Sequence, residues 1–461
     1  MSTTETKDTS RNHQPEKQTP ATRSKKSEKP AEHPITRALT SLIHKLRDFE
    51  DCADEYVSAA EKMQVERIKR VTADLSNSVD LLKNKDKQAK VLGLKQLLDS
   101  MPKIVQVLRA NPARVLRESL FVGMFSAFDA FTGDLLRALF LKKPALFSSS
   151  KRQIEVSVLM ESDTLDDLKQ RLIDDEIEAF RRESYVEQFS RLEQMFGLKL
   201  RSFSRWPDFV ERSQRRNLLV HCDGVVSEQY LSICKKVGMP CTEKLGTRLG
   251  ISLKYLKETV EVLMEVGLKL GHTLWRKVLP DELGQADMSL NNEIYERLQD
   301  EKWAPALTLA QFAIEQPRIS DDAMKKTFTV NYTIAAKFGG QEEKAKEFLA
   351  SLDWTAAAPR FQLAKAVLED RFDDAAAIML QVGKSDEFIA EHSYHVFPLF
   401  RTFRLSESFL RAYEKIFGYP FAAKVEQTAG DTKIQLEQAT SEKTGQGASP
   451  DGAPQQASQS K

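Results

Sequence analysis

Apolar side chains recur every three or four residues over most of the chain, which is the spacing of one face of an α-helix. The first stripe alternates steps of four and three through Ile35, Leu39, Leu42, Leu46, Phe49, Ala53, Tyr56, Ala60 and Met63. Its phase shifts at Ile68, and the polar run 83–87 permits the chain to reverse into a second helix. The pattern predicts a long helical hairpin, a coiled-coil-like arm, over residues 35–110. Simple packing and dimerisation are both open roles for it.

The next stretch, 111–280, has the pattern of a helical bundle. Asn111-Pro112 begins a helix, because Asn is a good N-cap and Pro is tolerated in the first turn. That helix has a strongly apolar face, made by Leu116, Leu120, Met124, Phe128, Phe131, Leu135 and Leu139. Small residues on it permit another helix to approach closely: Ser119, Gly123, Ser126, Ala127 and Ala130. Further amphipathic helices are predicted around 165–182, 184–197, 206–221 and 253–277.

Residues 291–420 repeat a looser helical pattern. Three segments with a small Ala between larger side chains occupy equivalent places: Trp303-x-x-Ala306-x-x-Leu309, Glu342-x-x-Ala345-x-x-Phe348 and Asp373-x-x-Ala376-x-x-Met379. Small residues at a crossing let paired helices pack closely. The segments resemble degenerate tetratricopeptide repeats, which predicts an α-solenoid-like domain and a candidate surface for a protein partner. A structural cap on the preceding bundle is the alternative.

The two ends of the chain differ in composition from the rest. Residues 1–34 are rich in Ser, Thr, Lys, Glu, Gln and Pro, and residues 421–461 are rich in Gln, Ser, Thr and Gly. Such segments bury too little apolar surface to offset the entropy lost on ordering. Both ends are predicted to be disordered tails.

Composition favours a soluble intracellular protein. The chain has 461 residues, of which 41% are hydrophobic and 29% charged, and it shows no strand-rich segment, so we expect an all-α protein of two or three domains. The net charge of +1 means that any nucleic-acid contact depends on a local basic patch. No apolar run reaches the ~18 residues of a membrane span. The four cysteines form no C-x-x-C pair, which fits a reducing cytosol. We therefore expect a cytoplasmic protein without a membrane partner.

One predicted helix carries an unusual group of polar residues. The run Arg215-Arg216-Asn217-Leu218-Leu219-Val220-His221 sets a guanidinium, an amide and an imidazole at fixed offsets. A guanidinium binds phosphate oxygens through its planar fork, and an imidazole titrates near neutral pH. Together they can hold a phosphodiester and move its protons without a metal. At ~100° per residue Arg216 lies about 140° from His221, so the guanidinium must reach around the helix.

These residues resemble a known family. Arg216-Asn217-x-x-x-His221 matches the Arg-polar-x-x-x-His signature of the HEPN superfamily (higher eukaryotes and prokaryotes nucleotide-binding), many of whose members are metal-independent ribonucleases. Upstream, Ser126-Ala127-Phe128-Asp129-Ala130-Phe131 resembles the serine-x-phenylalanine-acid-x-phenylalanine helix of many HEPN domains. The resemblance covers residues 111–280 and implies a HEPN-like helical bundle.

The resemblance also implies an activity. The protein would be an endoribonuclease that cuts RNA to 2′,3′-cyclic phosphate and 5′-hydroxyl ends without a cofactor, as a toxin or antiphage defence effector. His221 would act as general base or acid, and Arg216 would stabilise the charge that develops on phosphorus. Asn217 would orient His221 or the phosphate, and Asp129 would hold Arg216. Because family members generally juxtapose two motifs across a dimer, a homodimer is implied as well.

A basic segment precedes the motif. Arg205, Arg212 and Arg215 lie close to Arg216 in sequence and are candidates for binding RNA phosphates. A solvated basic face is the alternative explanation for them. No metal site is predicted, because the nearby set of potential ligands lacks a standard zinc spacing: His221, Cys222, Cys234 and Cys241.

Two other classes of function stay open. The first is a HEPN-like module that binds RNA or a nucleotide without cutting it. The second is a scaffold whose repeats and arm recruit protein partners, with the bundle as a structural element. A ribonuclease assay separates the first from the enzyme, and a pull-down with the 291–420 fragment addresses the second.

Overall fold

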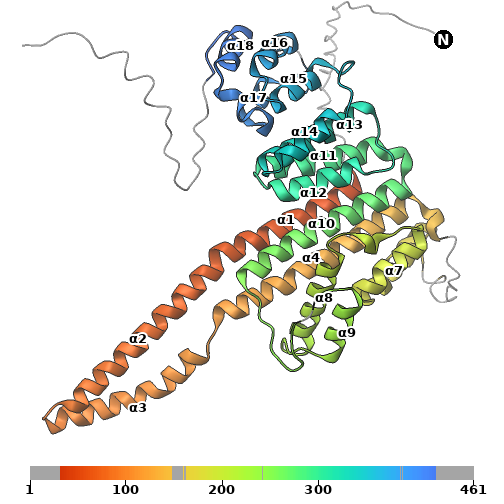
Figure 1. Cartoon of the computed structure of the whole chain (residues 1–461). Coiled ribbons are helices and arrows are strands. Elements are labelled where there is room, and N and C mark those ends of the chain that lie inside the picture. The colour runs from red at the N-terminus through yellow and green to blue at the C-terminus, as the bar shows by residue number, and fades with distance from the viewer. Residues whose placement is uncertain are drawn as a thin grey trace, which may run out of the picture. The chain divides into compact units, whose positions relative to one another are not determined.

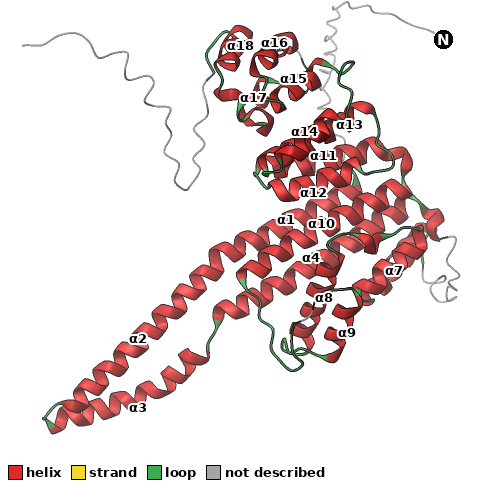
Figure 2. Ribbon diagram, viewed as in Figure 1, coloured by secondary structure: helices red, strands yellow, loops and turns green. Residues whose placement is uncertain are grey.

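The computed structural model of the chain describes residues 32–147, 159, 162–240, 242–384, 386 and 388–421. Within these ranges the regular elements are helical, apart from one isolated β-bridge between Val225 and Arg248 (Figure 2). The predicted all-α class is therefore confirmed for the described part of the chain. The predicted tails lie almost entirely outside it. The chain divides into two compact units, one up to Phe348 and one from Leu349, which are described separately.

A continuous helical rod begins the first unit. α1 spans Pro34–Cys52 and α2 spans Ser58–Lys83, and a π-helical turn at Ala53–Val57 joins them without a break. The His33 side chain caps the beginning of the rod by accepting a hydrogen bond from the Ile35 amide at 3.3 Å.

α2 pairs with α3 (Lys87–Arg109) as a helical hairpin (Figure 1). The chain reverses just before Asp86, whose carboxylate accepts hydrogen bonds from the first amides of α3. Near the beginning of α2, Gln64 donates a hydrogen bond of 2.7 Å to the Val107 carbonyl near the end of α3. The two helices therefore run antiparallel along their length.

Three helices form the core of the first unit: α1, α4 (Pro112–Lys142) and α10 (Leu253–Val278). α4 begins as predicted, since the Asn111 side chain accepts a hydrogen bond from the Arg114 amide at 2.9 Å. α1 buries its apolar stripe against α4 and α10, at Ile35, Ala38, Leu39, Leu42, Ile43 and Leu46. The first part of the predicted 35–110 arm thus belongs to the bundle, and the α2–α3 pair alone makes up the arm.

Glycines allow α1 to approach its neighbours closely. Gly267 of α10 faces Leu42, and a Cβ atom at position 267 would lie 2.5 Å from Leu42 Cδ2. Gly123 of α4, predicted to permit such an approach, faces the Phe49 ring with a Cβ distance of 2.8 Å. Both distances are too short for a side chain, so the core packing depends on these glycines.

Replacing Gly267 by alanine is expected to lower the free energy of unfolding by about 1–3 kcal/mol, the typical cost of overpacking a core. The added methyl group would displace Leu42 or push α1 away from α10. Gly284→Ala is a matched control, because nothing lies within 4 Å of a Cβ atom at that position. Urea denaturation of both variants checks the prediction. Equal free energies of unfolding would show that α1 shifts to make room for the methyl group without loss of stability.

The remaining helices of the first unit pack around this core. α6 to α9 lie against α4, α10 and one another, with bounds Leu165–Arg182, Tyr185–Phe196, Trp206–His221 and Glu228–Lys236. The helix predicted around 184–197 is present as α7: Ser184 begins it through a capping box with Glu187, and Gly197 ends it. α11 to α13 pack on one another and α11 and α12 also contact α10, with bounds Leu283–Gln299, Trp303–Ile314 and Asp322–Phe338.

The second unit has an aromatic core. α14 (Glu342–Ala350) leads into it, and α15 to α18 follow, with bounds Pro359–Leu368, Phe372–Val382, Glu391–Val396 and Glu407–Phe417. Five of its aromatic side chains are almost completely buried: Tyr394, Phe400, Phe403, Phe409 and Tyr413. His395 stacks on the Phe421 ring at 4.6 Å between centroids, and its Nε2 lies 3.1 Å from the Tyr413 hydroxyl.

The predicted 291–420 repeat domain is divided between the two units. Helices α11 to α13 belong with the bundle, because they pack in the same unit as α10. The alanines at the predicted helix crossings are buried, as expected for close packing: Ala306, Ala345 and Ala376. The solenoid-like arrangement of the repeats stays a prediction.

One described helical stretch, Lys87–Lys142, is long and apolar enough by length and composition alone to cross a membrane. It consists of α3 and α4, and 56% of its most apolar window is buried inside the protein. Burial of this kind is usual for the core helix of a soluble protein. The cytoplasmic location stays a prediction.

Candidate active site

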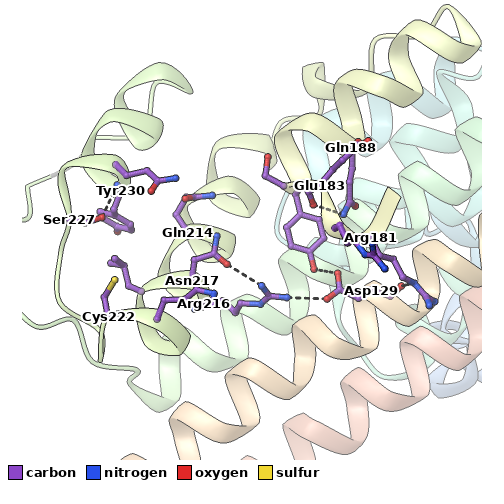
Figure 3. A pocket seen from close by; sticks show the side chains of 16 residues that line it. Asp129, Arg181, Glu183, Gln188, Gln214, Arg216, Asn217, Cys222, Ser227 and Tyr230 are labelled. Carbon is purple, nitrogen blue, oxygen red and sulfur yellow. Dashed lines mark hydrogen bonds and ion pairs between the residues drawn. The ribbon is translucent and has the colours of Figure 1, made fainter. Parts of the chain in front are cut away.

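Arg216 and Asp129 form an ion pair between α8 and α4 (Figure 3). Arg216 Nη2 lies 3.0 Å from Asp129 Oδ2, and the two side chains are 26% and 28% exposed. The other carboxylate oxygen, Oδ1, accepts a hydrogen bond of 2.5 Å from the Tyr185 hydroxyl at the beginning of α7. The contact that the resemblance implied between Asp129 and Arg216 is thus present, and a third helix supports it.

The surroundings of Asp129 explain why it needs two donors. The Tyr185 ring packs against Phe128 of α4 and Phe209 of α8, so the carboxylate lies at the edge of an aromatic cluster. Burial raises the pKa of Asp129, whereas the Tyr185 hydrogen bond and the charge of Arg216 act in the opposite direction. Burial also raises the pKa of Tyr185 well above its ordinary value, so this hydroxyl remains a donor.

Arg181 at the end of α6 holds the backbone of α4 near the same carboxylate. Its Nε donates to the Asp129 carbonyl at 3.1 Å, and its Nη2 donates to the Ala130 carbonyl at 3.3 Å. Gly133 makes room for it, because a Cβ atom at that position would lie 2.0 Å from Arg181 Nη2. The Asp129 turn of α4 is therefore fixed from outside the helix as well.

Arg216, Asn217 and His221 line a single cavity of about 370 Å³. Arg216 Nη1 donates to Asn217 Oδ1 at 3.0 Å, so Asn217 contacts the guanidinium (Figure 3). His221 is exposed at the last position of α8. A cavity of this size can hold a small ligand. The three motif residues therefore share one solvent-accessible space.

The turn after His221 is held in place from two sides. Asp223 and Gly224 both have a positive φ, 49° and 75°, which reverses the chain. The amides of Cys222 and Gly224 donate to the Leu218 carbonyl at 2.8 and 2.9 Å. Arg248 donates two hydrogen bonds, of 2.6 and 2.8 Å, to the Asp223 carboxylate. This turn fixes where α8 ends and hence where His221 stands.

The structure does not bring the predicted basic face to this cavity. Arg212 is buried, with its guanidinium between Asp208 and Glu258, and is no free phosphate ligand. Arg215 is directed to Glu211 at 2.8 Å. Arg205 lies near the beginning of α8 beside acidic groups, among them Asp208. None of the three arginines lines the cavity, because the side of α8 that carries Arg212 and Arg215 faces α10.

Glu211 is the reason for this orientation, and sequence patterns did not single it out. Its carboxylate is buried and accepts hydrogen bonds from the Tyr230 hydroxyl of α9 at 2.7 Å and the Tyr255 hydroxyl of α10 at 2.6 Å. Arg215 completes the set and lies over the Tyr255 ring, 4.3 Å from its centroid. Burial and the Glu211 charge raise the pKa of both tyrosines, which remain donors. The cluster ties α8 to α9 and α10.

Several cavity residues were missed by sequence reasoning. They are polar and come from α6, α7, α8 and the beginning of α9: Arg181, Arg182, Glu183, Ser184, Gln188, Gln214, Ser227 and Gln229. The one local signal for them was the Arg181-Arg182 pair at the end of a predicted helix. Together with Arg216 these arginines place three guanidinium groups around the cavity.

The cysteines near the motif occupy different environments. Cys222 is exposed and lines the cavity, whereas Cys234 is buried in an apolar cluster with Leu218 and Tyr230. Cys241 lies outside the described residues. In the part of the chain that the structure describes, no group of three or more His, Cys, Asp or Glu side chains is arranged to hold a metal ion.

Comparisons with protein-family models, with curated proteins and with solved structures find no match for this chain. Its site is therefore described by its own geometry: α8 presents an arginine, an amide and a histidine at one cavity, and Asp129 of α4, held by Tyr185 of α7, pairs with the arginine.

Proposed function

We propose that the chain is a metal-independent endoribonuclease of the HEPN type. The observation that carries this proposal is that Arg216, Asn217 and His221 line one cavity while Asp129, distant in sequence, pairs with Arg216. A guanidinium fixed in this way is ready to receive a phosphate without further ordering. An exposed imidazole at the same cavity can exchange protons with a bound substrate.

In the proposed reaction His221 takes the proton from a ribose 2′-hydroxyl. The 2′-oxygen attacks the adjacent phosphorus, the bond from phosphorus to the 5′-oxygen breaks, and the leaving oxygen takes up a proton from the second copy of His221 in the proposed dimer. The products are a 2′,3′-cyclic phosphate and a 5′-hydroxyl. General acid–base catalysis of this kind contributes typically ~10²–10⁴-fold to the rate.

The guanidinium of Arg216 stabilises the negative charge that grows on the phosphoryl oxygens in this reaction. Asp129 and Asn217 are positioning residues, because each holds one end of the Arg216 fork, at 3.0 Å in both cases. In this proposal Asn217 therefore orients Arg216 and the phosphate, not His221. The cavity arginines, Arg181 and Arg182, are further candidates for binding the RNA backbone.

A homodimer is part of the proposal. One chain supplies one imidazole to the cavity, whereas transesterification benefits from one group that removes a proton and another that donates it. A twofold axis that brings two cavities together would supply both, and twofold pairing is the commonest oligomer symmetry. A toxin or antiphage defence role and RNA as the partner follow from the resemblance alone.

The test is cleavage of labelled RNA by the purified full-length chain in excess EDTA, followed by end-group analysis. We expect 2′,3′-cyclic phosphate and 5′-hydroxyl ends. A DNA oligonucleotide with a single ribonucleotide should be cut only after that ribonucleotide, and its 2′-O-methyl counterpart should stay intact, because it lacks the nucleophile. If the chain binds RNA but does not cleave it, it is a binding module and not an enzyme. Activity that requires added Mg²⁺ would point to a different site.

A further inference from the structure

α3 carries two apolar seams, of which one has no partner among the residues that the structure describes. The inner seam packs on α2, and at Gly93 the approach is so close that a Cβ atom would lie 2.8 Å from Leu81 Cβ. Its other members are half-buried: Ala89, Leu97, Ser100, Ile104 and Val107. The outer seam is 44–70% exposed and consists of Val91, Leu94, Leu98, Met101, Val105 and Leu108.

The outer seam has the spacing of a coiled coil. Its six positions follow one another in steps of three and four, which is the a and d pattern of a heptad repeat. From Val91 to Leu108 the seam is about 26 Å long at 1.5 Å per residue. A helix in an isolated hairpin needs one seam, whereas a helix in a four-helix bundle contacts two neighbours and needs two.

The two sides of the hairpin differ in polarity. In an antiparallel pair, the residues that follow the inner positions point to the same side of both helices. On α2, Val65 follows the inner residue Gln64, and Val79 follows the inner residue Ser78. Both valines are exposed, at 50% and 36%, and they extend the apolar face of α3. The opposite groove is polar and is lined by Asp74, Asn77, Asp80, Gln96, Asp99 and Lys103, among others.

We infer that this apolar face, defined by the outer seam of α3 with Val65 and Val79, is where a second copy of the chain docks. The hairpins of the two copies then form a four-helix bundle. A face about 26 Å long and two helices wide covers roughly 500 Å². Two such faces bring together about 1,000 Å², which reaches the lower limit of a specific interface.

Neither a membrane nor an acidic partner fits this face as well. α2 and α3 contain no Phe, Tyr or Trp, the residues that interfacial membrane helices use as anchors. α3 carries five basic residues and one acidic one, with Lys87, Lys90, Lys95, Lys103 and Arg109 against Asp99. These charges repel one another in a pair of identical hairpins, so added salt should tighten the self-association. Salt would weaken a complex with an acidic protein or an anionic lipid surface.

The experiment is sedimentation equilibrium of the full-length chain at low and high salt. We expect the wild-type chain to associate, more tightly at high salt, and Leu98→Asp/Val105→Asp to halve the associated mass. The matched control, Asn77→Asp/Gln96→Glu, adds the same charge in the polar groove and should associate as the wild type does. All four positions are exposed in the single chain, so circular dichroism should show the same helix content in both variants.

A second measurement keeps the inference independent of the proposed ribonuclease. A photo-crosslinking residue at Leu98 should join two chains, and the crosslinked peptides should come from residues 58–109. The inference would be overturned by a monomeric wild type or by an associated mass that Leu98→Asp/Val105→Asp does not lower. Crosslinks to another region, or capture of the wild type by anionic vesicles, would overturn it as well. Ribonuclease activity enters none of these readouts, so failure of the proposed function leaves this result unchanged.

Discussion

His221→Ala and Arg216→Ala are each expected to abolish RNA cleavage, with a loss of at least ~10²-fold in rate, while the helix content and melting stay close to those of the wild type. His221 is exposed at the end of α8, and Arg216 is held at the cavity by surface-accessible groups, so neither forms part of the apolar core. Single-turnover cleavage of RNA and thermal melting of each variant check this prediction.

Two matched variants sharpen the test. Val220 is exposed beside His221 but does not line the cavity, so the Val220→Ala variant should cut RNA at the wild-type rate. Asp129→Asn should lower activity less than Arg216→Ala, because Asp129 acts through Arg216. If the His221→Ala or Arg216→Ala chain cuts RNA as fast as the wild type, the ribonuclease proposal is wrong for this site.

Glu211→Ala is expected to have the largest effect on stability, a loss of roughly 3–5 kcal/mol, which is typical when one partner of a buried ion pair is removed. The substitution would leave the Arg215 guanidinium and the hydroxyls of Tyr230 and Tyr255 without their shared acceptor. Urea denaturation measures the loss. Glu66→Ala removes an exposed carboxylate from an ion pair with Lys69 and should leave the stability nearly unchanged. If the Glu211→Ala variant is as stable as this control, the cluster does not stabilise the packing of α8 on α9 and α10.

Local chemistry in the sequence predicts the helices that carry the site. Asn111-Pro112 begins α4, and the Ser184 capping box and Gly197 delimit α7, because caps act on the amides and carbonyls of their own turn. The pairing of Asp129 with Arg216 joins residues far apart in sequence, so no local pattern predicts it. The family resemblance supplied that expectation, and the structure contains the contact.

Tertiary packing decided the features that sequence reasoning misplaced. The arginines that precede the motif were predicted to bind RNA phosphates, but Arg215 pairs with the buried Glu211 carboxylate, and Arg212 is buried on the same side of α8. Likewise, the stripe from Ile35 continues without interruption into the arm. Its first part is buried in the bundle because Gly267, much later in the chain, leaves space for it. Neither outcome is encoded within one helix.

The π-helical turn at Ala53–Val57 sets the direction in which the apolar face of the α2–α3 arm points relative to α1. Such a turn holds one residue more than a turn of α-helix, so it rotates everything after it by about 100° around the rod. Loss of one residue there would rotate the apolar face of the α2–α3 hairpin around the rod relative to α1, and it would also change the packing of the buried Ala53 and Val57 side chains. In an assembly built on that face, a single insertion or deletion would thus reset the angle and spacing between the two bundles. Because the proposed reaction draws on two cavities brought together, the length of this turn would also set how the two cavities face each other.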